Sequence, residues 1–139
     1  MAKYNLGQYY AAIEDYSKAI DINPMDSTSY NGRGLAKYSL GRYESAVEDY
    51  SKTIELNPNE QNTYLIRGLA HGKLGQYELA IVDYSKALEL SPNEPDTYLI
   101  RGVAYGKLGQ NKAAIEDFSN AILLNPQNSN AYNGRGNAK

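Results

Sequence analysis

The sequence contains no cysteine, which excludes a disulfide framework and any thiol site. It has no tryptophan, one phenylalanine and one histidine, and a net charge of only −2 from 14 basic and 16 acidic residues. Nucleic-acid binding rests on clustered Lys and Arg, so it is not expected here. No apolar run approaches the roughly 18 residues of a membrane span, and residues 1–10 lack the apolar centre of a signal peptide. We therefore expect an intracellular, cytoplasmic chain without nucleic-acid or membrane partners.

Tyrosine is abundant, with 14 residues, and much of it recurs at a fixed interval. A step of 34 positions separates successive members of three sets: Pro24, Pro58, Pro92 and Pro126; Gly7, Gly41, Gly75 and Gly109; Tyr30, Tyr64, Tyr98 and Tyr132. A fixed period of about 20 to 50 residues indicates a solenoid built from one repeated unit.

Each unit is predicted to be a pair of helices. In residues 64–92, Gly75 is suited to the left-handed residue that ends a helix, and Pro92 stops the second helix. That second helix has one apolar stripe with helical spacing: Tyr77, Ala80, Ile81, Tyr84, Ala87 and Leu88. Applied to the whole chain, this pattern predicts helices at 9–22, 27–40, 43–56, 61–74, 77–90, 95–108, 112–124 and 129–139. Residues 1–6 are predicted to be the end of a preceding first helix.

The repeated residues also form a family signature. One copy has Tyr64, Gly68, His71, Ala80, Tyr84, Ala87 and Pro92, and the next has Tyr98, Gly102, Tyr105, Ala114, Phe118, Ala121 and Pro126. This pattern resembles the tetratricopeptide family over essentially the whole chain. The resemblance implies an all-α fold, a right-handed superhelical α-solenoid of antiparallel helix pairs. The chain departs from the family where Arg33, Arg67, Arg101 and Arg135 replace the usual leucine.

We expect a single array, cut from a longer one. Residues 1–26 form a partial repeat, 27–60, 61–94 and 95–128 are whole repeats, and 129–139 are a second partial repeat. The two partial repeats are complementary, so segments 1–22 and 129–139 of different molecules are predicted to associate head-to-tail.

Two recurring features predict how the helices pack. Gly34, Gly68, Gly102 and Gly136 would cost helix stability unless they allow close helix approach, and Ala46, Ala80 and Ala114 are the expected facing residues. The stem of each recurring arginine is expected to be partly buried, and a buried charge needs a partner. We therefore predict that each arginine pairs with an aspartate of its own or the preceding repeat. The alternative is a solvated guanidinium on a buried stem.

Few residues have the arrangement that catalysis or metal binding needs. His71 lies in the core-facing register, so a packing role is favoured over catalysis. Asp15, Asp49, Asp83 and Asp117 occur once per repeat and do not converge on a metal. The pairs Gly32/Gly34 and Gly134/Gly136 lie in helical register without a preceding strand, which argues against a phosphate loop. We expect no catalytic residue, metal or cofactor, and no enzyme activity.

The resemblance implies that the first helices line a concave groove that takes a peptide segment of another protein. By register the groove would present Tyr4, Asn5, Asn31, Leu35, Tyr38, Asn62, Leu65, Leu69, Lys73, Leu99, Val103, Lys107, Asn130 and Asn133. Several apolar members lie away from the core stripe, and a second apolar face needs a ligand or a neighbour. Gly72 and Gly106 would leave room above this face. The alternative is that superhelical curvature buries it.

Chaperone-tail-binding members of the family hold a terminal carboxylate with Lys, Asn and Arg. The matching positions here hold residues such as Leu65, Ile66, Leu69, Leu99 and Ile100, so chaperone tails are not favoured ligands. Two function classes remain. One is an interaction scaffold that binds a peptide in the groove, and the other is a structural array that stacks on itself.

Overall fold

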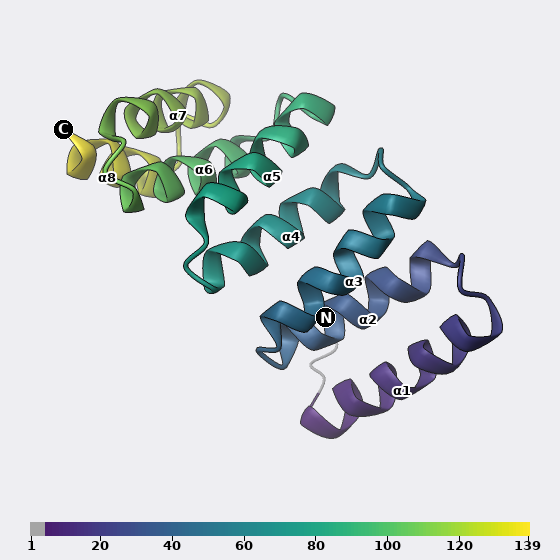
Figure 1. The fold of residues 1–139 in the computed structure, drawn as a ribbon. Helices are drawn as coiled ribbons and strands as arrows, with labels where there is room; N and C mark the ends of the chain where they lie inside the picture. Colours follow the sequence, from purple (N-terminus) through teal and green to yellow (C-terminus); the bar gives the residue numbers. More distant parts are fainter. Residues whose placement is uncertain (1–4) are drawn as a thin grey trace.

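The computed structural model describes residues 5–139, and these form eight α-helices with no strand among them (Figure 1). The helices are α1 (Leu6–Ile22), α2 (Ser27–Ser39), α3 (Tyr43–Leu56), α4 (Gln61–Lys73), α5 (Tyr77–Leu90), α6 (Pro95–Lys107), α7 (Asn111–Leu124) and α8 (Ser129–Ala138). Seven of them start and end within one residue of the predicted positions, and α1 is the exception. The fold is an all-α solenoid.

Glycine and proline set the two kinds of turn. Gly41, Gly75 and Gly109 have φ of +77°, +73° and +74°, a left-handed conformation that glycine adopts at little cost. Each lies between the first and second helices of a pair. The second helices end before Pro24, Pro58, Pro92 and Pro126, which cannot donate the next helical hydrogen bond. This alternation explains why the helix ends could be read from the sequence.

The start of α1 corrects one prediction. The repeat pattern predicts Gly7 as the turn that follows a first helix, but Gly7 lies inside α1, which begins at Leu6 rather than Tyr9. Asn5 caps this helix: its side chain accepts a hydrogen bond from the Gln8 amide at 3.0 Å, and the Gln8 side chain accepts one from the Asn5 amide. This reciprocal cap lets the helix include three more residues. The rest of the predicted segment 1–6, residues 1–4, lies outside the described residues.

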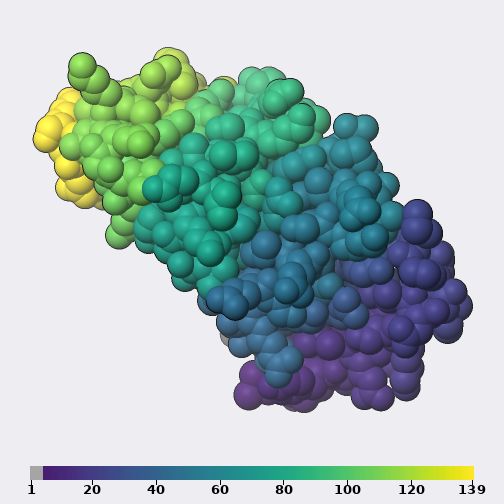
Figure 2. Space-filling view, viewed as in Figure 1, coloured from purple at the N-terminus to yellow at the C-terminus, as the bar shows by residue number. Residues whose placement is uncertain are grey.

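The helices stack in chain order into an elongated body (Figures 1 and 2). The main contacts join consecutive helices, and α6 also contacts α8. The interior is a column of small and aromatic side chains, in which Ala46, Ala80 and Ala114 are completely buried. Each repeat is therefore covered mainly by its neighbours, as expected for a solenoid.

The atoms nearest to three of the close-approach glycines belong to aromatic rings, which the sequence analysis did not predict. A Cβ atom at Gly34, Gly68 or Gly102 would lie 2.7, 2.6 or 2.9 Å from the ring of Tyr50, Tyr84 or Phe118, respectively. The rings of the second helices therefore reach the backbone of the first helix at these positions. Gly136 has no described atom within 4 Å of its Cβ position, so the predicted close approach is absent there.

The buried hydroxyl of Tyr50 is expected to destabilise the fold, and a single substitution can remove it. Tyr50 is fully buried, and its hydroxyl has no hydrogen-bond partner among residues 5–139. Burial raises the pKa of Tyr50 well above its ordinary value. We expect Tyr50→Phe to raise the free energy of unfolding by about 1 kcal/mol at pH 7, because an unpaired buried hydroxyl is destabilising. The third repeat already has Phe118 in this position.

The same substitution should reduce alkaline destabilisation. Below pH 10 Tyr50 is protonated in both states; above it, only the unfolded chain ionises, and stability falls as pH rises. The free energy of unfolding is expected to fall by about 1.4 kcal/mol per pH unit for each such tyrosine, until the tyrosine also ionises in the folded protein. Urea denaturation at pH 7, 10 and 11 measures both effects. A Tyr50→Phe variant that is less stable than wild type at every pH would contradict this prediction.

Candidate peptide-binding groove

Three of the four repeated arginines, Arg33, Arg67 and Arg101, each form a two-pronged ion pair with an aspartate of the same repeat. Arg67 of α4 donates from Nε and Nη2 to Asp83 of α5 at 2.9 and 2.8 Å. The same two atoms donate at 2.9 and 2.7 Å from Arg33 to Asp49, and at 2.8 and 2.7 Å from Arg101 to Asp117. The aspartate hydrogen bond raises the pKa of each arginine, while burial acts in the opposite direction. The predicted pairing is confirmed for these three pairs.

A serine of the preceding repeat completes each cluster. The Nη1 atoms of Arg33, Arg67 and Arg101 donate to Ser17, Ser51 and Ser85 at 3.1, 3.1 and 3.0 Å. Each arginine therefore joins three consecutive helices, and we call the set the Arg–Asp–Ser node. The serines were missed from the sequence, although Ser17, Ser51, Ser85 and Ser119 recur every 34 positions, two positions after each aspartate.

A second cation or a histidine extends two of these nodes. Lys37 lies 3.0 Å from Asp49, and in the same register His71 Nε2 lies 3.8 Å from Asp83. His71 Nδ1 lies 2.8 Å from the Gln76 side chain. The histidine is half-buried and is fixed between helices, which agrees with the predicted packing role.

The predicted groove residues differ in exposure. Tyr4 lies outside the described residues. Asn5 caps α1 instead of projecting from a first helix. Those exposed on first helices are Leu35, Asn62, Lys73, Val103, Lys107, Asn130 and Asn133; those half-buried are Asn31, Tyr38, Leu65, Leu69 and Leu99.

The apolar residues of this face fall into two groups. Leu65 and Leu69 pack against the core cluster of Ala80, Tyr84 and Ala104, so burial between repeats accounts for part of the second apolar face. Leu35 and Val103 are 49% and 46% exposed. The face is therefore only partly covered by the fold, and Leu35 on α2 and Val103 on α6 remain exposed.

A pocket of about 260 Å³ opens between α4 and α6. Its wall is apolar, formed by Leu69, Tyr77, Tyr84, Ile100, Val103 and Ala104. Gly72 forms part of the wall without a side chain, and the nearest atom to its Cβ position is the Tyr84 hydroxyl at 3.6 Å. Lys73 and Lys107 also line it, so an apolar hollow is combined with two positive charges.

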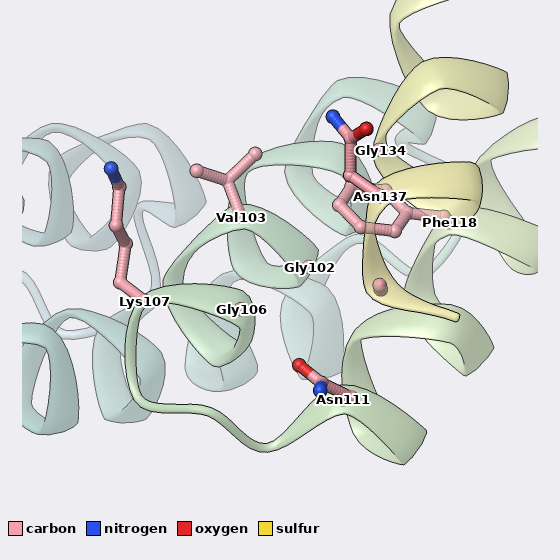
Figure 3. A pocket seen from close by; sticks show the side chains of 9 residues that line it. Gly102, Val103, Gly106, Lys107, Asn111, Phe118, Gly134 and Asn137 are labelled. Atoms are coloured by element: carbon pink, nitrogen blue, oxygen red, sulfur yellow. The ribbon is translucent and has the colours of Figure 1, made fainter.

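A second pocket, of about 310 Å³, lies one repeat further along, between α6 and α8 (Figure 3). In Figure 3, Val103 and Lys107 project from α6 on one side, and Phe118 and Asn137 lie across from them. Gly102, Gly106 and Gly134 contribute backbone to the wall, and no described atom lies within 4 Å of the Cβ position of Gly106. The room that the sequence predicted above Gly72 and Gly106 is present in both places.

Asn31 lines a separate, polar hollow of about 210 Å³, together with Ser27, Thr28, Thr53, Asn57, Glu60 and Thr63. Its Oδ1 atom is buried and has no hydrogen-bond partner among residues 5–139. Within those residues, no group of three or more His, Cys, Asp or Glu side chains could hold a metal ion. None of the eight helices is long and apolar enough to cross a membrane.

Comparisons with solved structures agree with this fold. MamA superposes with a TM-score of 0.92 at 26% identity, over 95% of this chain and 77% of that one. The TPR domain of Arabidopsis OM64 is 30% identical, with a TM-score of 0.76, over 81% of this chain and 93% of that one. The second TPR domain of human RPAP3, solved in complex with the HSP70 peptide SGPTIEEVD, is 29% identical, with a TM-score of 0.77, over 82% and 95%.

No curated protein matches the sequence. Two family models match it along its length. The one described as TPR repeat covers residues 2–41 and 73–109, which is more than half of the chain, and the one described as Tetratricopeptide repeat covers residues 27–60 and 95–128. The chain belongs to the tetratricopeptide repeat family.

Proposed function

We propose that this chain is a protein-interaction scaffold that binds a peptide segment of a partner along its first helices. The observation that carries the proposal is the pair of apolar pockets beside α6, each lined by Lys107. An exposed apolar hollow with a few charged groups at its edge is the usual form of a binding site. The complex of the related human RPAP3 domain with a peptide supports this reading. The proposed activity is binding alone, without catalysis.

The lining of the pockets defines the ligand. Apolar walls take apolar side chains, and Lys73 and Lys107 are exposed and favour acidic residues nearby. The RPAP3 peptide, SGPTIEEVD, combines apolar and acidic residues in this way. We expect micromolar affinity, which corresponds to about −8 kcal/mol, for peptides of this composition.

A charge reversal on α6 tests the proposal. We expect Lys107→Glu to weaken binding of a mixed apolar and acidic peptide roughly tenfold, or about 1.4 kcal/mol. Lys86→Glu, on the second helix α5, is the control, because Lys86 lines neither pocket. Fluorescence anisotropy at two salt concentrations measures the effect, which should shrink at high salt. If wild type binds acidic, basic and scrambled peptides equally, or binds none, the proposal is wrong.

Blocking the carboxyl terminus of the peptide separates groove binding from chaperone-tail recognition. The positions expected to clamp a terminal carboxylate hold apolar residues such as Leu65 and Ile66. The amidated peptide should therefore bind as tightly as the free acid.

Head-to-tail association is a second candidate, favoured by two unpaired members of the Arg–Asp–Ser register. Arg135 contacts Ser119 at 3.4 Å, but no ion pair joins it to a described residue. Asp15 has the register of Asp49, yet it is exposed and forms no ion pair within residues 5–139. If α8 of one molecule were placed before α1 of another, Arg135 and Asp15 would complete a node.

A charge exchange tests this contact. We expect Arg135→Asp or Asp15→Arg alone to abolish concentration-dependent association, and a mixture of the two variants to restore it. Sedimentation velocity across a concentration series measures both. If the wild-type protein remains monomeric at the highest concentration, the second candidate fails and the first is unaffected.

A further inference from the structure

We propose that the two pockets beside α6 are consecutive seats for one peptide, which places two bulky apolar side chains three positions apart with an acidic residue between them. This inference rests on the proposed peptide-binding function and specifies its ligand.

The two pockets are the same site in successive repeats. Lining residues of the first correspond, 34 positions later, to lining residues of the second: Leu69 to Val103, Gly72 to Gly106, Tyr77 to Asn111, Tyr84 to Phe118 and Ile100 to Gly134. A site that recurs with the repeat is a consequence of the architecture, so a ligand that fills one pocket meets an equivalent pocket at the next step along the stack.

Glycine keeps both seats open. In the preceding repeat the same register holds Tyr38, whose ring packs edge-on against Tyr43 with 5.2 Å between ring centres. Tyr43 in turn has the register of Tyr77 and Asn111. The first repeat therefore fills with its own side chain the place that Gly72 and Gly106 leave to a ligand.

The distance between the seats follows from their shared wall. Val103 and Lys107 line both pockets, so the seats lie on two sides of α6. A helix with its side chains is about 10–12 Å across. A polyproline-type strand rises about 3.1 Å per residue with three residues per turn, so side chains three positions apart lie on one face about 9 Å apart. This spacing is close to the width of α6, and we infer that side chains three positions apart reach the two seats.

The two seats differ in shape and polarity. The α4–α6 seat is smaller, contains Ile100 and has the Tyr84 hydroxyl near Gly72. The α6–α8 seat is larger, because Gly134 and Asn111 replace Ile100 and Tyr77. We therefore assign an aliphatic side chain to the first seat and an aromatic one to the second. Lys107 stands between them, where it faces an acidic residue of the peptide.

Substitution of the two glycines by tyrosine tests the assignment. The probes are capped peptides with the core Leu-Glu-Glu-Phe and, for the opposite chain direction, Phe-Glu-Glu-Leu. Each is compared with versions in which Leu or Phe is Ala, and with versions that separate the two by two or four positions. Binding is measured by calorimetry to wild type, Gly72→Tyr and Gly106→Tyr, and thermal melts confirm that each variant is folded. Gly106→Ala is the control that adds only a methyl group in open space.

We expect Gly106→Tyr to weaken binding at least tenfold and to remove the effect of changing Phe, while the effect of changing Leu persists. Gly72→Tyr should also weaken binding, but it should remove the effect of changing Leu, while the effect of changing Phe persists. The three-position spacing should bind most tightly in one of the two directions. A folded Gly106→Tyr variant with wild-type affinity, or equal affinity at all spacings, would overturn the seats while leaving groove binding intact. Absence of binding by wild type would overturn both.

Discussion

Replacing Asp83 with alanine is expected to lower the free energy of unfolding by about 3 kcal/mol. Asp83 is 2% exposed and holds two nitrogens of Arg67, whose side chain is 22% exposed. Breaking a buried ion pair costs about 3–5 kcal/mol, since the remaining charge is left without compensation. We expect the lower end of this range because part of the guanidinium can still reach water. Urea denaturation at pH 7 measures the change.

Asp15→Ala is the matched control, because Asp15 has the same register but is exposed and pairs with no described residue. We expect its effect to stay within about 0.5 kcal/mol. Arg67→Leu should also destabilise the protein, by leaving Asp83 buried without its cation. If Asp83→Ala and Asp15→Ala had equal effects, the Arg–Asp–Ser node would not contribute to stability.

Gly68→Ala is expected to lower the free energy of unfolding by about 2 kcal/mol through overpacking, although alanine is the better helix former. The new Cβ would lie 2.6 Å from the Tyr84 ring and 3.2 Å from the Asp83 Cβ atom. Tyr84 is 3% exposed, so its ring cannot move aside without repacking. Overpacking of this kind costs about 1–3 kcal/mol, and it disturbs the neighbouring ion pair as well.

Gly136→Ala, in contrast, is not expected to lower the free energy of unfolding. Gly136 occupies the register of Gly68, but no described atom lies within 4 Å of its Cβ position. We expect Gly136→Ala to be neutral or to stabilise by up to about 1 kcal/mol, through helix propensity alone. Thermal melts of Gly68→Ala and Gly136→Ala measure the two changes in stability. A stabilising Gly68→Ala would show that the Tyr84 ring yields easily and that the glycine is not required for packing.

The sequence was most informative where one residue type decides the local conformation. Gly41 and Pro58 define helix ends by backbone stereochemistry alone, so seven helices could be predicted to within a residue. The Arg67–Asp83 pairing could be predicted because a buried charge requires compensation. The start of α1 could not, since it depends on whether Asn5 acts as a cap or as part of a preceding helix, and the repeat pattern allows both.

The groove was harder to predict because exposure depends on the packing of several repeats. Leu69 and Val103 have the same register in successive repeats, yet Leu69 packs on the core cluster and Val103 is exposed. The contrast between Tyr38 and Gly72 is visible in the sequence, but its meaning requires the position of Tyr43. The identity of the ligand stays a proposal, because the sequence determines the residues that line the pockets but not the peptide that binds there.

The Arg–Asp–Ser node also bears on how such an array can change length. Every node takes its arginine and aspartate from one repeat and its serine from the repeat before, always 16 positions away in either direction. Duplication or deletion of any one full period, starting at any residue, therefore rebuilds complete nodes at the new junction and leaves no buried charge unpaired. Gene-level gain or loss of whole units is tolerated electrostatically, and each added unit can bring a glycine or a tyrosine at the Gly72 position. Length and binding capacity can then vary in discrete steps, independently of each other.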